Sequence, residues 1–130
     1  MFFLIDHNIE GQSKRLWGTI QDEGWLDLVK IRFVTFEEVQ LPIESSDRIV
    51  WCFAQEYKMI ILTANRKMKG RDSLEEIIRS ENTVNSLPVI TIENVDRMNE
   101  RVYREQCAAR IIDIMIDLEN LIGVGRIYIP

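Results

Sequence analysis

Short apolar runs and longer segments with helical periodicity alternate along the chain. A brief apolar run that stops at polar residues is typical of a strand buried on both faces. The clearest case is Phe2-Phe3-Leu4-Ile5, which ends at Asp6. Such runs, together with segments rich in β-branched and aromatic residues, predict strands at residues 2–5, 28–36, 59–63 and 89–92 and a short edge strand at 127–129.

Helices are predicted between these strands, at residues 9–23, 47–57, 72–81 and 96–120. Ser45 and Ser46 are available to cap the second helix, and Asp72 with Glu75 has the spacing of a capping box at the third. Strands that alternate with helices form βαβ units. The pattern therefore predicts an α/β fold, a three-layer α/β/α domain with a mostly parallel central sheet.

The last predicted helix, at residues 96–120, carries more apolar side chains than one sheet face requires. The apolar residues that nearly encircle it are Ile111, Ile112, Ile114, Met115 and Ile116. A helix that is apolar all round is buried on more than one side. Two interpretations follow: the helix is the central one of its layer, or it also forms the interface of a homodimer.

Length and composition indicate one globular domain without a membrane segment. A chain of 130 residues can bury one core and is too short for two domains, so residues 1–130 are expected to form a single domain. No apolar run approaches the roughly 20 residues that span a bilayer, and the N-terminal run lacks the basic leader of a signal peptide. We expect Cys52 and Cys107 to be buried, reduced thiols and the location to be cytoplasmic.

The net charge of −5 argues against a protein that coats DNA by electrostatics alone. It leaves room for an acidic, metal-dependent site with a local basic rim. A basic loop follows the third predicted strand, with the residues Arg66, Lys67, Lys69 and Arg71. These side chains either contact phosphate groups beside such a site or cover a solvated loop.

Polar side chains follow the predicted strands at the edge where open α/β folds bind their ligands. The candidates at the ends of the first and third strands and at the starts of helices are Asp6, Asn8, Thr63, Asn65, Asp47 and Asp72. Carboxylates that converge with amides and a hydroxyl offer the hard oxygen ligands that Mg²⁺ or Mn²⁺ requires. A cation held in this way can lower the pKa of a bound water and clamp a phosphate oxygen during phosphodiester hydrolysis.

Five of these six candidates also have a purely structural explanation. Asp6 or Asn8 can cap the first helix. Asp47 in a first helical turn is favoured by the helix dipole alone. Asp72 fits a helix cap, and Asn65 fits a turn.

In their order and spacing, three segments resemble the PIN-like nuclease family. They are the strand that runs into Asp6-His7-Asn8, the helix start Ser46-Asp47-Arg48-Ile49-Val50, and Ile61-Leu62-Thr63 with the polar loop behind it. The resemblance covers about residues 2–92 and is closest to the short single-domain branch that begins with a Phe-Leu-Val-Asp-Glu-Asn type of segment. It implies a Mg²⁺- or Mn²⁺-dependent ribonuclease, often the toxin of a toxin–antitoxin pair, with Asp6 as the first acid and Asp47 as the second.

The chain departs from the family pattern after the third strand. The family usually carries Thr-x-Asp-x-Asp-Phe there, whereas this chain has Asn65 and Lys67 at the acidic positions, and His7 stands where Glu is common. The site is therefore short of at least one carboxylate. Either Asp72 supplies one from a few residues downstream, or the metal is bound weakly or not at all.

The first functional hypothesis is an active metal-dependent nuclease that acts on RNA. In this hypothesis the metal ligands are Asp6, Asp47 and Asp72. The residues expected to orient water or phosphate and to hold the RNA backbone are Thr63, Asn65, Asn8, Arg66 and Lys67.

The second hypothesis is a catalytically inactive PIN-like module. Such a module would act through contacts with an antitoxin or another protein, or through dimerisation by the 96–120 helix. The missing acid favours this hypothesis, whereas Asp6, Asp47 and the basic loop favour the first. A receiver-like signalling domain ranks last, because Thr63 rather than a phosphoacceptor Asp closes the third strand.

Overall fold

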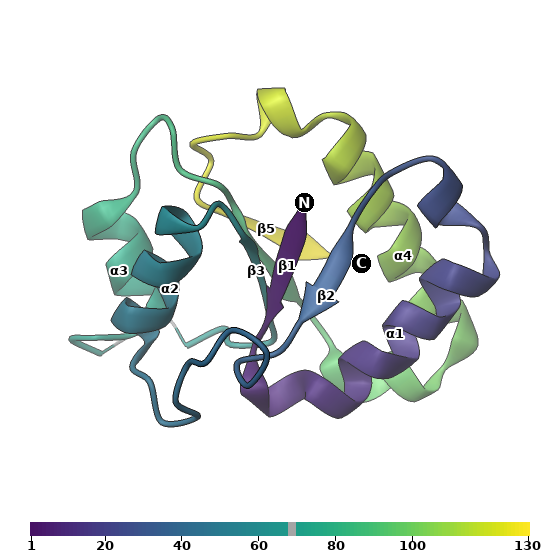
Figure 1. Ribbon diagram of the computed structural model, residues 1–130, viewed down its shortest axis with the longest axis horizontal. Helices are drawn as coiled ribbons and strands as arrows, with labels where there is room; N and C mark the ends of the chain where they lie inside the picture. The colour runs from purple at the N-terminus through teal and green to yellow at the C-terminus, as the bar shows by residue number, and fades with distance from the viewer. Residues whose placement is uncertain (68–69) are drawn as a thin grey trace.

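Residues 1–67 and 70–130, which the computed structural model describes, form a five-stranded parallel sheet with helices on both faces (Figure 1). The strands are β1 (Phe2–Ile5), β2 (Arg32–Val34), β3 (Ile60–Thr63), β4 (Val89–Ile92) and β5 (Arg126–Ile129). The helices are α1 (Glu10–Asp22), α2 (Asp47–Glu56), α3 (Leu74–Glu81) and α4 (Arg101–Ile116). The predicted α/β/α architecture is confirmed.

The strand order in the sheet is β2-β1-β3-β4-β5. This is the 2-1-3-4-5 order of flavodoxin-like folds, in which the order reverses between β1 and β3 and ligands bind beyond the carboxyl ends of these two strands. Leu4 of β1 pairs with Ile61 of β3, and the Asp6 amide continues the pairing by donating to the Leu62 carbonyl at 2.9 Å. Asp6 therefore stands directly at this switch point.

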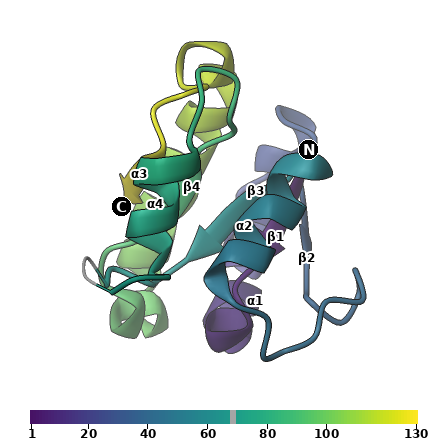
Figure 2. The same cartoon turned by 90° about the vertical axis from the view of Figure 1, so that its left-hand side faces the viewer.

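The two helical layers bury opposite faces of the same strands. Helices α1 and α4 cover one face, and α2 and α3 cover the other (Figure 1 and Figure 2). Phe3 and Ile5 pack in the core under α1 and α4, whereas Leu4 packs in the core under α2 and α3. Because neighbouring residues of β1 are buried on opposite sides, the strand is apolar without interruption, which is the signal that predicted it.

The strand β2 is shorter than the predicted strand at 28–36. A 3-10 turn at Trp25–Asp27 follows α1, and Leu28 is exposed. Only three residues of β2 pair with β1, from Arg32 opposite Phe2 to Val34 opposite Leu4. The predicted strand is too long because β-branched residues also occur where a connecting segment packs against the core, as buried Ile31 does.

The predicted helix at 96–120 is interrupted. Val95–Asn99 and Leu118–Asn120 are 3-10 turns, and α4 occupies only Arg101–Ile116 between them. The break falls at Glu100, whose backbone is extended with φ −95° and ψ 125°. The Arg97 guanidinium pairs with the Glu100 carboxylate at 3.1 Å. The periodicity continues through the break because Met98 is buried in the same core as α4.

The apolar excess of α4 is absorbed largely inside the domain. Ile111, Ile112 and Ile114 are buried in the core that α4 shares with α1 and the sheet. Val102 and Ile116 stay exposed, at 64% and 62% of their surfaces. The position of α4 within its layer thus explains the buried isoleucines without a second copy of the chain, and dimerisation through this helix stays a prediction.

Helix caps and cysteines correct two expectations. Ser46 caps α2 by accepting from the Ile49 amide at 3.2 Å, as predicted. The predicted capping box at Asp72 is wrong, because Ser73 caps α3 by accepting from the Glu76 amide at 3.2 Å.

Of the two cysteines, both expected to be buried, Cys107 is buried and Cys52 on α2 is exposed; both are free thiols. No helix among residues 1–67 and 70–130 is long and apolar enough to cross a membrane.

Candidate functional site

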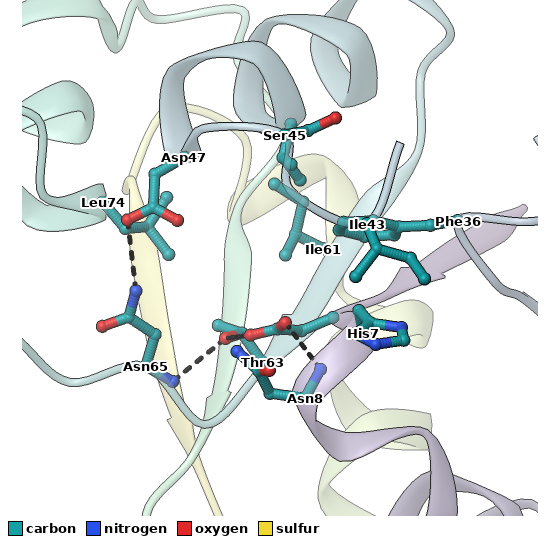
Figure 3. Close-up of a pocket in the computed structure, with 12 residues that line it drawn as sticks. His7, Asn8, Phe36, Ile43, Ser45, Asp47, Ile61, Thr63, Asn65 and Leu74 are labelled. Atoms are coloured by element: carbon teal, nitrogen blue, oxygen red, sulfur yellow. Dashed lines mark hydrogen bonds between the residues drawn. The ribbon is translucent and has the colours of Figure 1, made fainter. Parts of the chain in front are cut away.

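A small polar pocket lies beyond the carboxyl ends of β1 and β3, at the switch point of the sheet (Figure 3). Its volume is about 140 Å³. The residues that line it are Asp6, His7, Asn8, Phe36, Ile43, Ser45, Asp47, Val50, Ile61, Thr63, Asn65 and Leu74. The fold therefore brings five of the predicted site residues into one pocket, namely Asp6, Asn8, Asp47, Thr63 and Asn65.

Asp6 is held in place by both of its carboxylate oxygens. Oδ1 accepts from the Asn8 amide at 3.1 Å, which caps the 3-10 turn at His7–Ile9, and Oδ2 accepts from the Thr63 hydroxyl at 2.6 Å. The structural and functional explanations of Asp6 are thus compatible. The same carboxylate starts the turn after β1 and faces the pocket, and its carboxylate oxygens have lone pairs left for further contacts.

Asp47 begins α2 on the opposite wall of the pocket. Ser46 already caps the helix, so the Asp47 side chain is available to accept from the Asn65 amide Nδ2 at 3.3 Å. Burial raises the pKa of the Asp47 carboxyl, and the negative charge of Asp6 raises it further. The Leu74 amide, the Asn65 side chain and the Lys67 ammonium lower this pKa in part. Asp6 and Asp47 are therefore close enough to repel each other, a condition that a bound cation relieves.

The loop after β3 connects the two acids. Thr63 Oγ1 accepts from the Asn65 amide at 3.0 Å while it donates to Asp6. Asn65 Oδ1 accepts from the Lys67 amide at 3.1 Å, so its NH₂ group is the part that reaches Asp47. Asn65 is thus both a turn residue and a partner of an acid, and its oxygen is engaged within the loop.

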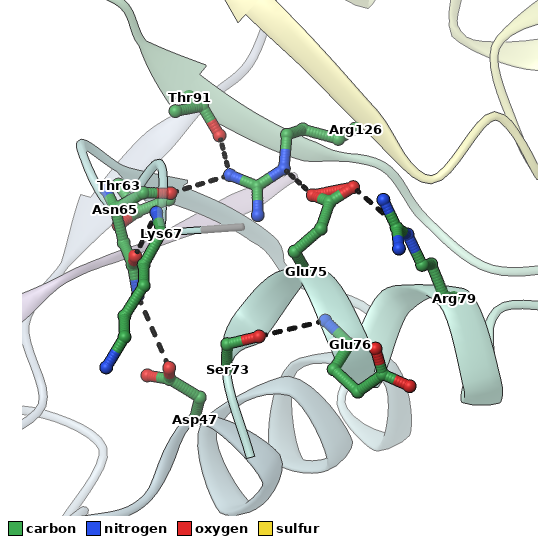
Figure 4. Close-up of polar contacts among 10 residues, drawn as sticks. All are labelled: Asp47, Thr63, Asn65, Lys67, Ser73, Glu75, Glu76, Arg79, Thr91 and Arg126. Atoms are coloured by element: carbon green, nitrogen blue, oxygen red, sulfur yellow. Dashed lines mark hydrogen bonds and ion pairs between the residues drawn. The ribbon is translucent and has the colours of Figure 1, made fainter. Parts of the chain in front are cut away.

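A buried ion pair that no local sequence pattern indicates anchors this loop (Figure 4). Arg126, at the start of β5, donates through Nη1 to the Asn65 carbonyl and to Thr91 Oγ1, each at 2.7 Å. Its Nε lies 3.2 Å from Glu75 Oε2, and the two side chains are exposed by only 6% and 16%. Asn65 precedes Arg126 by 61 residues and Glu75 precedes it by 51 residues. No local pattern around Arg126 therefore indicates either partner.

The other predicted residues are not gathered at the pocket. Asp72 and Arg66 are exposed and do not line it, and Arg66 instead borders a separate hollow with Glu93 and Asp96. Lys67 is exposed, yet its side chain extends toward Asp47 (Figure 4). Lys69 of the basic loop lies outside the described residues.

The donor set suits at most one hard cation. Within residues 1–67 and 70–130, no group of three or more His, Cys, Asp or Glu side chains is placed to hold a metal ion. Asp6 and Asp47 remain, and Mg²⁺ commonly binds through one or two carboxylates with waters and substrate phosphates as its other ligands. The mutual repulsion of Asp6 and Asp47 also fits a cation between them.

Comparisons with known proteins add no family to this description. No family model matches the chain, and neither curated proteins nor solved structures include a match. The strand order is shared with receiver-type domains. A receiver domain requires a phosphoacceptor Asp at the end of β3. This chain has Thr63 there, and its hydroxyl donates to Asp6.

Proposed function

We propose that this chain is a metal-dependent ribonuclease of the PIN-like type. The observation that carries the proposal is the pair Asp6 and Asp47, which come from separate elements and line one polar pocket at the switch point of a parallel sheet. A site with this geometry can hold a divalent cation against a phosphate group. The order of the motifs around Asp6, Asp47 and Thr63 supports the same reading. RNA is the proposed substrate, and an antitoxin is the proposed protein partner.

Asp6 and Asp47 are the residues that would hold Mg²⁺ or Mn²⁺. When bound, the cation supplies a water of lowered pKa and positive charge for the developing oxyanion of the phosphodiester. Thr63 orients the Asp6 carboxylate through its hydroxyl, and Asn65 orients Asp47 through its amide. Asn8 contributes the backbone amide that fixes the second oxygen of Asp6.

Lys67 gives the site a fixed positive charge where the resembling family carries an acid. Its ammonium acts on Asp47 electrostatically, and an exposed ammonium at the rim is suited to a phosphate oxygen. Arg66 is also exposed and can contact the backbone of a longer RNA. The chain thereby replaces part of the charge that a second cation would bring, and the proposed site binds one metal ion.

A catalytically inactive module is the second candidate. The observations that favour it are Asn65 and Lys67 in place of acids and the lack of a three-acid cluster in the described part of the chain. Such a module would use the exposed side chains Val102 and Ile116 of α4 for a partner or a second copy. The two candidates differ in one respect that is simple to measure, namely cleavage of RNA.

The test is cleavage of a fluorescently labelled single-stranded RNA in the presence of Mn²⁺. We expect cleavage by the unmodified chain, and we expect Asp6→Asn and Asp47→Asn to reduce it to the level seen with EDTA. Asp113→Asn, the same change at an exposed position of α4, is the matched control and should cleave normally. Cleavage by Asp6→Asn at the normal rate would remove the acid pair from the reaction.

A further inference from the structure

A second hollow lies around the sheet edge from the acidic pocket, between α1 and the edge strand β2. Its volume is about 330 Å³, which falls at the lower end of the range of about 300–1,000 Å³ for ligand pockets. The residues that line it are Ile5, Glu10, Ser13, Lys14, Trp17, Arg32, Phe33, Thr35 and Glu38. The proposed nuclease site uses none of these side chains.

The aromatic part of the hollow consists of Trp17 from α1 and Phe33 from β2. Their ring centroids are 4.9 Å apart with an angle of 45° between the planes. Phe33 is stacked in turn on buried Phe3, with centroids 5.7 Å apart and planes inclined by 26°. Both Trp17 and Phe33 are half-buried, so they present ring surface that is held by the core and still borders the hollow. Rings fixed in this way favour a flat, aromatic ligand.

Ser13 of α1 provides an unsatisfied polar group in the same hollow. The residue is only 2% exposed, and its Oγ has no hydrogen-bond partner among the described residues. A buried hydroxyl without a partner is unfavourable unless a ligand or a water completes it. Charged side chains also line the hollow. Lys14 and Arg32 are donors, and Glu10 and Glu38 are acceptors.

The two hollows share no lining residue, but some of their lining residues are neighbours in the chain. Ile5 lines the second hollow and Asp6 the acidic pocket, and Thr35 and Phe36 are divided in the same manner. His7 of the acidic pocket contacts Glu10 of the second hollow, with Nδ1 and Oε2 3.1 Å apart. An RNA that crosses this contact between His7 and Glu10 from a phosphate at Asp6 would reach the hollow lined by Trp17 and Phe33.

We infer that this second hollow binds one nucleobase of a single-stranded RNA, next to the phosphate bound at the acidic pocket. The inference rests on the proposed ribonuclease function and specifies how the substrate is recognised. A nucleobase has the flat face that the aromatic rings require and the mixed donors and acceptors that Ser13 and the charged side chains require. A purely apolar ligand would leave the Ser13 hydroxyl unpaired, whereas Glu10 and Glu38 already have partners within the protein.

The base-binding test uses nucleoside 5′-monophosphates and, as the probe without a base, ribose 5-phosphate. Titrations of the full chain in EDTA are followed by NMR through the indole N–H signals of the tryptophans. We expect the nucleotides to shift the Trp17 signal and to bind at least about fivefold more tightly than ribose 5-phosphate. Trp51, which is buried under the opposite face of the sheet, is an internal control and should not shift.

Two variants test the hollow itself. Trp17→Leu should weaken nucleotide binding at least about fivefold, whereas Tyr57→Leu, at an exposed aromatic residue of the α2 end, should leave it unchanged. Ser13→Ala should weaken binding by about fivefold without lowering the melting temperature, because it removes an unpaired hydroxyl. This second variant answers the question if Trp17→Leu does not fold.

Equal binding of ribose 5-phosphate and the nucleotides, or an unshifted Trp17 signal, would overturn the base site. The measurement needs no metal and no cleavage, so its failure is separate from that of the nuclease. Base binding that persists in Asp6→Asn supports the inference, and loss of RNA cleavage in that same variant supports the proposed function independently.

Discussion

The buried pair of Arg126 and Glu75 is the structural feature with the largest predicted effect on both stability and the site. We consider Arg126→Leu, which keeps most of the packing volume and removes the charge. The Glu75 side chain is only 16% exposed and would lose its partner at 3.2 Å, keeping only Arg79, whose Nε lies 4.0 Å from Glu75 Oε1. The Asn65 carbonyl and the Thr91 hydroxyl would each lose a donor at 2.7 Å. Removal of one member of a buried ion pair costs about 3–5 kcal/mol of unfolding free energy.

Urea denaturation measures this cost through the midpoint and the slope of the transition. The matched control is Arg48→Leu, which breaks an ion pair with Glu81 on the same helix α3 at 2.6 Å. Because those side chains are 43% and 44% exposed, the control should lose at most about 1 kcal/mol. The double variant Arg126→Leu with Glu75→Leu removes both charges and should recover most of the loss.

The site provides a second readout of the same change. Arg126 holds the Asn65 carbonyl, and Asn65 in turn donates to Asp47. Because both the single and the double variant lose this contact, Mn²⁺ binding should weaken in both. Equal losses of stability in Arg126→Leu and Arg48→Leu would refute the reasoning about burial. Full Mn²⁺ affinity in a stable double variant would show that the pair does not position the site.

Three further predictions concern the acidic pocket. The pKa of Asp47 lies above its usual 3.8, so the folded state binds this proton more strongly than the unfolded state, and stability should fall as pH rises from 3.8 through the raised pKa. Asp47→Asn should remove this loss and raise the melting temperature at pH 7, and an unchanged pH profile of stability in the variant would contradict the assignment. Thr63→Val leaves the Asp6 oxygen without its hydroxyl donor and should cost about 1–3 kcal/mol in urea denaturation, with weaker Mn²⁺ binding; a neutral result in both assays would show that this hydrogen bond does not support the site. Lys67→Asp replaces the fixed positive charge by a carboxylate and should tighten Mn²⁺ binding in calorimetry, whereas a weaker affinity would mean that Lys67 assists the metal site in its present form.

The elements that were predicted well are those whose signals are local. β4 was predicted at its observed bounds because Val89–Ile92 is an uninterrupted apolar run between polar loops. Asp6 could be placed at the sheet edge because an apolar strand must deliver its next residue there. Ser45 and Ser46 were recognised together as available caps because a serine before a helix is a local signal, and the structure uses Ser46.

The features that were missed depend on partners far away in the sequence. Glu75 reads as half of a capping box with Asp72, but in the fold it pairs with Arg126 and leaves the cap to Ser73. The break of the last helix at Glu100 was hidden because buried Met98 keeps the apolar period across it. A pattern of neighbouring residues reports which side chains are buried and does not report which polar groups meet inside the fold.

Under the proposed function, Asp6 and Asp47 form one binding site for a divalent cation. Isothermal titration calorimetry with Mn²⁺ on the unmodified chain, Asp6→Asn, Asp47→Asn and the control Asp113→Asn tests it most directly. We expect saturable binding of one ion that is lost in both pocket variants and kept in the control. No binding to the unmodified chain, or undiminished binding to Asp6→Asn, would contradict it and make the inactive module the better explanation.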